Sequence, residues 1–116
     1  MTKLMKKCYR RSNIEIHHVI EKRFRPIFRI SPDYWPAVAM SKPVHRTITN
    51  CFRKAHGYNY KNSSKHYDLS KIKMRNIVKA VYRDMSILRT VALKQIDNYY
   101  VKSSENPLYN KKKGRR

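Results

Sequence analysis

The chain has 116 residues and carries 28 Lys and Arg against 7 Asp and Glu, which gives a formal charge of +21 at pH 7. This length fits one small domain, and such a charge attracts nucleic acid first and an anionic membrane surface second. Hydrophobic residues make up 41% of the chain, which excludes a purely disordered basic tail. No apolar run approaches the roughly 20 residues of a membrane span, and the basic start lacks the apolar stretch of a signal peptide.

The first half of the chain predicts two short strands joined by an irregular connection. Residues 1–13 are expected to form a basic N-terminal arm, and the alternating apolar residues of IEIHHVI then predict a strand. Three prolines in the stretch EKRFRPIFRISPDYWP break any long helix, so a loop or a turn of helix is expected there. The apolar run from Trp35 to Met40 predicts the second strand.

The second half predicts helices. Ser41 followed by Lys-Pro is a helix start, and apolar residues recur at helical spacing up to a stop at Gly57. A polar loop over 58–66 leads to a helix capped by Asp68 or Ser70, and a break near Ser86 precedes a last helix. Residues 101–116 are expected to be a basic flexible tail. The expected fold is a small α+β domain over residues 14–100.

The histidine pair His17-His18 lies at the end of the first predicted strand. Successive side chains of a strand point to opposite faces, so one imidazole could face a metal ion and the other a substrate. The alternative is that one is packed and the other solvated. A third histidine, His45, lies one turn into the helix that begins after the second strand.

The words HHVIEKRF and WPAVAMSKPVHRTITNCFRKA resemble the HNH-type nuclease modules found at the C-termini of Rhs-type and other large polymorphic bacterial toxins. Those modules carry an HH-I-E-K-R-F word, an apolar strand, a Ser/Thr-Lys helix start, an H-x-x-x-T-N segment and an Arg. The likeness is specific from Ile14 to Lys54 and looser up to Ile96. It implies a small ββα-metal (HNH-like) core with additional C-terminal helices.

The resemblance also implies a catalytic site. His18 would be the general base, for which a neutral imidazole is suited at cellular pH. His17 and His45 would be metal ligands, and Thr49 occupies the position where many members of the family place a further ligand. Mg²⁺ is the expected working ion, with Zn²⁺, Mn²⁺ or Ni²⁺ as alternatives that imidazole ligands favour. The middle Asn of the family is missing, and Asp33 is the local candidate to orient the base.

Four further residues within the matching words are candidates for the site. Glu21 either contacts the site or serves at a helix start or in a salt bridge. Arg23 and Arg53 are expected to reach the scissile phosphate, which a bidentate guanidinium fits well. Asn50 lies about 140° around the helix from His45 and is expected to hydrogen-bond a strand or cap the site.

The function implied is that of a metal-dependent endonuclease that hydrolyses phosphodiester bonds of DNA with little sequence specificity. Such a module would be a bacterial toxin or effector, delivered by a larger carrier into the cytoplasm of a target cell. The producing cell would need an immunity protein, and an acidic one would complement this charge. The alternatives are a non-catalytic basic nucleic-acid-binding protein, an RNA-cleaving version of the fold, and a degenerate HNH domain that binds without cutting.

Overall fold

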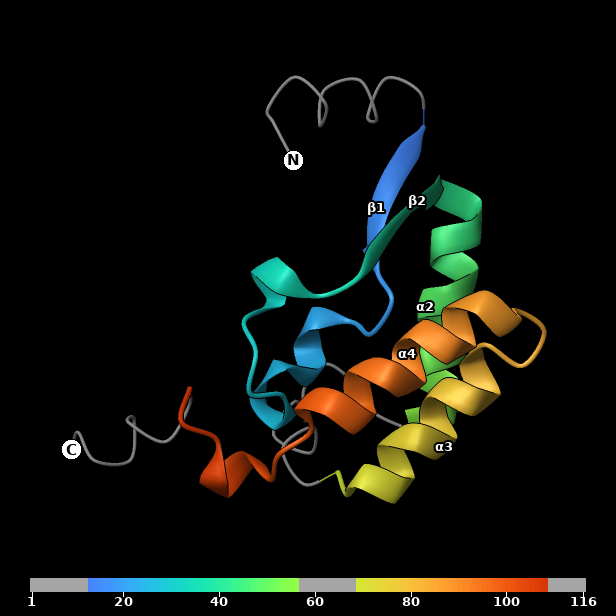
Figure 1. Ribbon diagram of the computed structural model, residues 1–116. Coiled ribbons are helices and arrows are strands. Elements are labelled where there is room, and N and C mark those ends of the chain that lie inside the picture. The colour runs from blue at the N-terminus through green and yellow to red at the C-terminus, as the bar shows by residue number, and fades with distance from the viewer. Residues whose placement is uncertain (1–12, 57–68, 109–116) are drawn as a thin grey trace.

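The computed structural model describes residues 13–56 and 69–108, which form a two-stranded antiparallel sheet and a set of helices (Figure 1). The elements in chain order are β1 (Ile14–His18), the 3-10 helices η1 (Lys22–Ile27) and η2 (Pro32–Tyr34), β2 (Ala37–Ser41), α2 (Lys42–His56), α3 (Lys71–Val81), α4 (Ser86–Tyr99) and the 3-10 helix η4 (Ser103–Glu105). The predicted α+β class is confirmed. Within the described ranges, no helix has both the length and the apolar character that crossing a membrane requires.

The β1–β2 hairpin presents the two adjacent histidines to opposite sides. The antiparallel register pairs His17 with Val38 and His18 with Ala37. His17 is 1% exposed, whereas His18 is only half-buried, as the alternation of a strand requires. The second strand begins at Ala37 rather than Trp35 because Trp35 ends η2, where its N–H donates to the Pro32 carbonyl.

The helix starts follow the predicted capping chemistry. The hydroxyl of Ser41 accepts from the backbone N–H of Val44 at 3.4 Å, and the hydroxyl of Ser70 accepts from that of Lys73 at 3.1 Å. Ser70 is therefore the cap of α3, rather than Asp68, and α4 begins at the predicted break, Ser86. The predicted stop at Gly57 and the polar loop lie outside the described residues, as do residues 1–12 of the arm.

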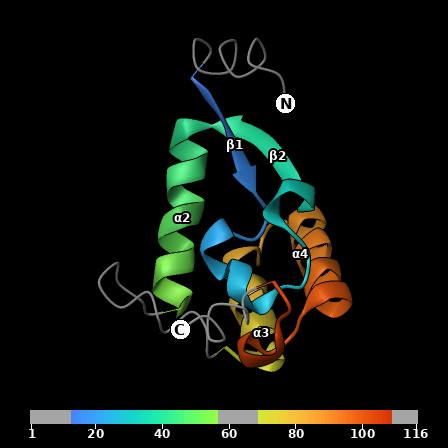
Figure 2. The same ribbon diagram turned by 90° about the vertical axis from the view of Figure 1, so that its left-hand side faces the viewer.

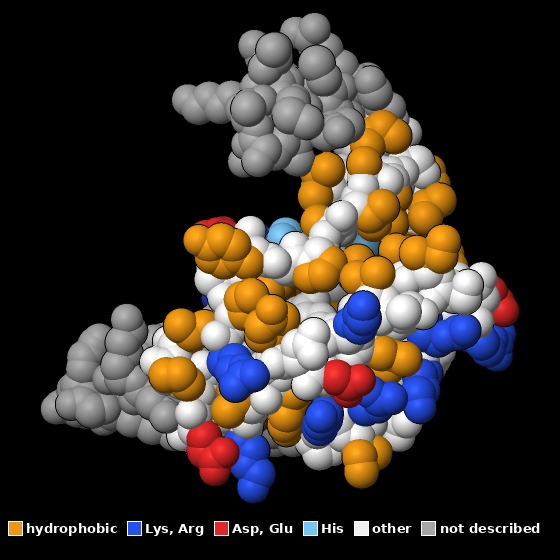
Figure 3. Space-filling view, in the orientation of Figure 1, with side chains coloured by type: hydrophobic (Ala, Val, Ile, Leu, Met, Phe, Trp, Pro, Cys, Tyr) orange, Lys and Arg blue, Asp and Glu red, His pale blue; other side chains and the backbone are white. Residues whose placement is uncertain are grey.

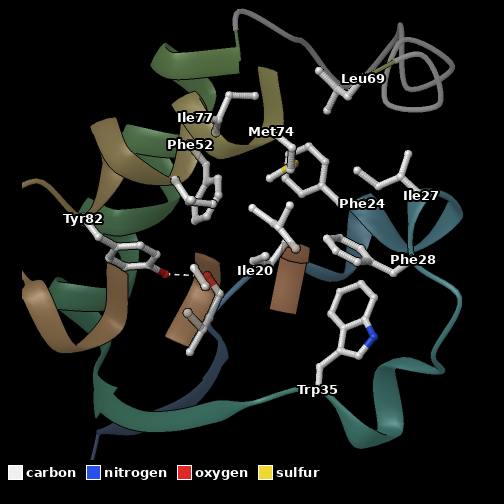
Figure 4. Packing of buried hydrophobic residues seen from close by; sticks show 14 of the residues in the cluster. Ile20, Phe24, Ile27, Phe28, Trp35, Phe52, Leu69, Met74, Ile77 and Tyr82 are labelled. Carbon is white, nitrogen blue, oxygen red and sulfur yellow. Dashed lines mark hydrogen bonds between the residues drawn. The ribbon is translucent and has the colours of Figure 1, made fainter. Parts of the chain in front are cut away.

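The core joins the hairpin to the helices. Figures 1 and 2 show α2 running alongside the hairpin, and α3 packs against both α2 and α4. Aromatic rings fill the centre (Figure 4): the ring centroid of Phe52 lies 5.9 Å from that of Phe24 and 6.0 Å from that of Tyr82. Phe28 packs edge-to-face on Trp35 at 5.1 Å. Such tilted pairs stabilise a core beyond the area that they bury.

The prediction of a flexible tail from residue 101 is wrong for residues 101–108. The Val101 N–H donates to the carbonyl of Ile27 at 2.9 Å. Asn106 is fully buried, and its amide donates to the carbonyls of Pro26 and Phe28 at 2.7 and 2.8 Å. The composition of this stretch is polar, but one asparagine satisfies two buried carbonyls, one in the last turn of η1 and one just after it, and so holds the segment in place. Residues 109–116 lie outside the described residues.

Candidate metal and phosphate site

An open pocket of about 370 Å³ lies between the start of β1 and one face of α2. Its lining residues are Glu15, Lys42, His45, Arg46, Thr49, Asn50 and Arg53. The six helical members recur at intervals of three and four residues, which places them on one side of α2. Four of the predicted site residues, His45, Thr49, Asn50 and Arg53, are therefore brought together.

His17 approaches this group from the neighbouring strand. Its ring centroid lies 4.9 Å from that of His45, edge-on. Its Nε2 atom is 2.8 Å from the hydroxyl of Tyr82, and the same hydroxyl donates to the carbonyl of Val19 at 2.6 Å. Burial, with the positive charges of His45 and His18, lowers the pKa of His17 to about 4. The imidazole is therefore neutral at cellular pH.

His45 is oriented by a carboxylate that the sequence analysis did not single out. Its Nδ1 atom lies 2.7 Å from Oε1 of Glu15 on β1. Because a carboxylate accepts only, the imidazole donates its Nδ1 proton, and a neutral ring in this tautomer has its lone pair on Nε2. A metal-binding histidine usually has such a partner, which fixes its tautomer and raises its basicity. Glu15 lies two residues before His17, so the alternation of the strand already places both on one face.

Glu21 lies next to Thr49, and its side chain is buried, with 9% of the residue exposed. Its carboxylate forms an ion pair with Arg23 at 2.6 Å. Burial raises its pKa, while Arg23, a hydrogen bond from the Thr49 side chain, and the charges of His45 and Arg53 oppose that rise. Of the alternatives for Glu21, the structure shows the salt bridge, and its hydrogen bond with Thr49 places it next to a residue that lines the pocket. Arg23 pairs with Glu21 and is not among the residues that line the pocket.

Thr49, predicted as a further metal ligand, contacts Glu21 in the structure. Its hydroxyl donates to the Glu21 carboxylate, one turn along α2 from His45. A hydroxyl that donates its proton keeps its oxygen lone pairs, so Thr49 stays a predicted ligand. The prediction for Asn50 is refined: its exposed side chain borders the pocket, so it caps the site at the rim.

His18 points away from the pocket and lies against Trp35, with the two ring centroids 6.4 Å apart. Burial and the charge of Lys22 lower its pKa, opposed by Asp33 and by a hydrogen bond to the backbone of Pro32. The group that orients the ring is thus the main-chain carbonyl of Pro32, the first residue of η2, with Asp33 contributing its charge. Sequence reasoning missed Pro32 because every residue has a carbonyl and none leaves a sequence signal.

The strongest candidates to hold a metal ion are the imidazoles of His17 and His45, which lie edge to face. Within residues 13–56 and 69–108, no group of three His, Cys, Asp or Glu side chains lies close enough together to hold an ion. No protein-family model matches the chain, and comparisons with curated proteins and with solved structures give no significant match.

Proposed function

We propose that the chain is a metal-dependent endonuclease of the HNH type that hydrolyses the phosphodiester backbone of DNA with little regard to sequence. One observation carries the proposal: His17 and His45, distant in the sequence, lie 4.9 Å apart by their rings, and each has one nitrogen held by an oxygen of a neighbouring side chain. Three cationic side chains line the adjoining pocket, namely Lys42, Arg46 and Arg53. A cation site beside a phosphate site is what phosphodiester hydrolysis needs.

The residues fit a divalent cation held by few protein ligands. His17 and His45 would supply nitrogen donors, which suit Zn²⁺, Mn²⁺ or Ni²⁺, and Mg²⁺ where water fills most of its shell. A bound cation would polarise the phosphate and lower the pKa of a coordinated water. With only two protein donors, most of the coordination shell stays open to water and to phosphate oxygens.

The phosphate would be held by the basic face of α2. A guanidinium binds a phosphate through two parallel hydrogen bonds, so Arg46 and Arg53 are better suited than a lysine to orient it. Lys42 adds charge, and Asn50 offers an amide at the rim. In the view of Figure 3, further Lys and Arg side chains gather over the helices, which would attract the backbone of nucleic acid without reading bases.

His18 is proposed as the general base, reaching the substrate from the opposite face of β1 to His17. In the described residues β1 pairs with no strand other than β2. Side chains from both faces of a strand border each of its edges. A phosphodiester that crosses the edge of β1 away from β2 would meet the cation site on one side and the His18 imidazole on the other. The Pro32 contact holds that ring in one orientation.

The sequence resemblance supports the biological setting of a bacterial toxin module. A nuclease module of a polymorphic toxin would act on nucleic acid in a competitor cell and be neutralised by an immunity protein in the producer. With a net charge of +21, an acidic immunity protein would associate fastest.

The test is incubation of supercoiled plasmid with the protein and Mg²⁺, Mn²⁺, Zn²⁺ or Ni²⁺, with and without EDTA. We expect metal-dependent nicking. His18→Ala should lower the rate by roughly 10²–10⁴-fold and leave Zn²⁺ affinity unchanged, as expected for a base. His45→Ala should lose both cleavage and Zn²⁺ binding. Lys79→Ala, on the exposed face of α3, is the control.

A second candidate is a non-catalytic nucleic-acid-binding protein. The observation that favours it is the position of His18, outside the pocket and against Trp35. This candidate predicts a retarded band in a gel-shift assay and intact plasmid with every metal ion. Parallel digestion of tRNA separates an RNA-cleaving enzyme from both. If neither nucleic acid is cut, the enzymatic proposal is refuted and the binding function remains.

A further inference from the structure

Tyr82 connects the helical pair to the histidine on the strand. It caps the C-terminus of α3, 65 residues from His17, and is fully buried. Its hydroxyl lies at the centre of two hydrogen bonds, one with His17 Nε2 and one with the Val19 carbonyl, and Figure 4 shows its ring pointing from the helix toward the hairpin. The functional assignment above leaves this residue without a role.

The direction of both hydrogen bonds follows from counting protons. A phenol hydroxyl has one proton, and a carbonyl oxygen can only accept. At 2.6 Å from the Val19 carbonyl, the hydroxyl must donate there, because two oxygens without a proton between them would repel. It therefore accepts from His17, whose Nε2 atom carries the proton. The lone pair of the neutral ring is then on Nδ1.

We propose that Tyr82 is the positioning residue of His17 and fixes the tautomer in which Nδ1 offers its lone pair to a metal ion. The proposal rests on the metal site proposed above and extends it to the helical pair. Glu15 has the corresponding role for His45: it lies on β1 rather than on a helix, and its carboxylate accepts a hydrogen bond from Nδ1 of that ring.

A purely structural role makes a different prediction. If the Tyr82 hydroxyl only ties the end of α3 to Val19, its removal costs stability and leaves the proton on His17 where it was. If it sets the tautomer, its removal frees the ring to place the proton on either nitrogen. The two readings differ in a spectroscopic signature, which does not depend on cleavage or on a bound metal.

The experiment is ¹⁵N NMR of the imidazole rings in the metal-free chain at pH 7, with His17 assigned by comparison with His17→Gln. Protonated and bare ring nitrogens resonate in separate regions, so the tautomer is read directly. We expect the wild-type ring to have its proton on Nε2, and Tyr82→Phe to show a mixture or the reverse. Tyr100→Phe is the matched control, since that hydroxyl also donates to a backbone carbonyl, of Leu69 at 2.8 Å.

The second readout is the affinity for Zn²⁺ alone, measured by titration calorimetry. Loss of a residue that orients a metal ligand costs roughly 10–100-fold in affinity, and Tyr82→Phe should fall in that range while Tyr100→Phe does not. A wild-type ring protonated on Nδ1, or a Tyr82→Phe protein with unchanged tautomer, overturns the inference. If Tyr82→Phe does not fold, the wild-type tautomer alone decides. Should the tautomer be as expected but no metal bind, the proposed function fails and the positioning role stands.

Discussion

Asn106 provides the sharpest test of how the C-terminal segment is held. Its side-chain amide donates to the carbonyls of Pro26 and Phe28, and its side-chain oxygen accepts from the N–H of Leu108 at 2.9 Å. The residue is fully buried, so water cannot readily take the place of a lost donor. Asn106→Ala leaves two buried carbonyls without this partner.

The size of the effect follows from those two carbonyls. An unsatisfied buried polar group costs about 1–3 kcal/mol, so the free energy of unfolding should fall by roughly 2–6 kcal/mol. This is a large fraction of the roughly 5–15 kcal/mol that stabilises a typical domain. At about 4–8 °C for each kcal/mol, Tm should drop by at least about 8 °C. Asn106→Asp keeps the shape but turns oxygen atoms toward both carbonyls, so its cost at pH 7 should be at least as great.

Thermal and urea unfolding followed by circular dichroism measure the change. Leu108→Ala is the control, because it trims a side chain that is 40% exposed and keeps the backbone N–H that Asn106 accepts. A shift within about 0.5 kcal/mol is expected there. If Asn106→Ala is no more costly than this control, the segment 101–108 is not held as described and the argument from the buried amide is wrong.

Three further predictions address the core and the site. Phe52→Ala should cost about 3–5 kcal/mol in unfolding experiments, against less than about 1 kcal/mol for the exposed Val44→Ala on the same helix; equal costs would contradict the core described. Glu15→Gln should weaken Zn²⁺ binding about 10-fold in calorimetry and change the free energy of unfolding by no more than about 1 kcal/mol. An unchanged affinity would show that Glu15 does not orient His45 for metal binding. Arg46→Ala should reduce the slope of log K against log salt for duplex DNA by about 1, and an unchanged slope would exclude Arg46 from the phosphate site.

Most of the secondary structure could be predicted from the sequence because it depends on local chemistry. Alternating apolar residues predicted β1, and the Ser-Lys-Pro start with apolar residues at helical spacing predicted α2. The sequence alone does not decide between Asp68 and Ser70 as the cap of α3, since both have a side-chain oxygen that can accept from a backbone N–H of the first turn. Local patterns of this kind need no knowledge of the rest of the chain.

The side chains around the histidines were harder to predict, because they depend on contacts between distant segments. Tyr82 and Asn106 meet their partners across 65 and about 80 residues, and nothing near either residue indicates this. Thr49 shows the same limit of local patterns: its spacing from His45 predicts a ligand, but nothing in that spacing predicts the hydrogen bond that its hydroxyl donates to Glu21. The spacing of residues along a helix specifies which of them share a face. It does not specify which residues of distant segments pack against that face.

The position of Tyr82 and Asn106 also explains why a hairpin and one helix would not suffice to build this site. A two-stranded sheet is at best marginally stable in water, and fixing an imidazole within it requires contacts from outside. Here α3 reaches the buried histidine through a phenol, and the segment after α4 reaches η1 through an amide. Both contacts are polar and buried, so they specify one arrangement, whereas apolar packing would tolerate several. The C-terminal helices therefore help to hold the residues of the proposed site, and we expect the β1–β2 hairpin and α2 to depend on them.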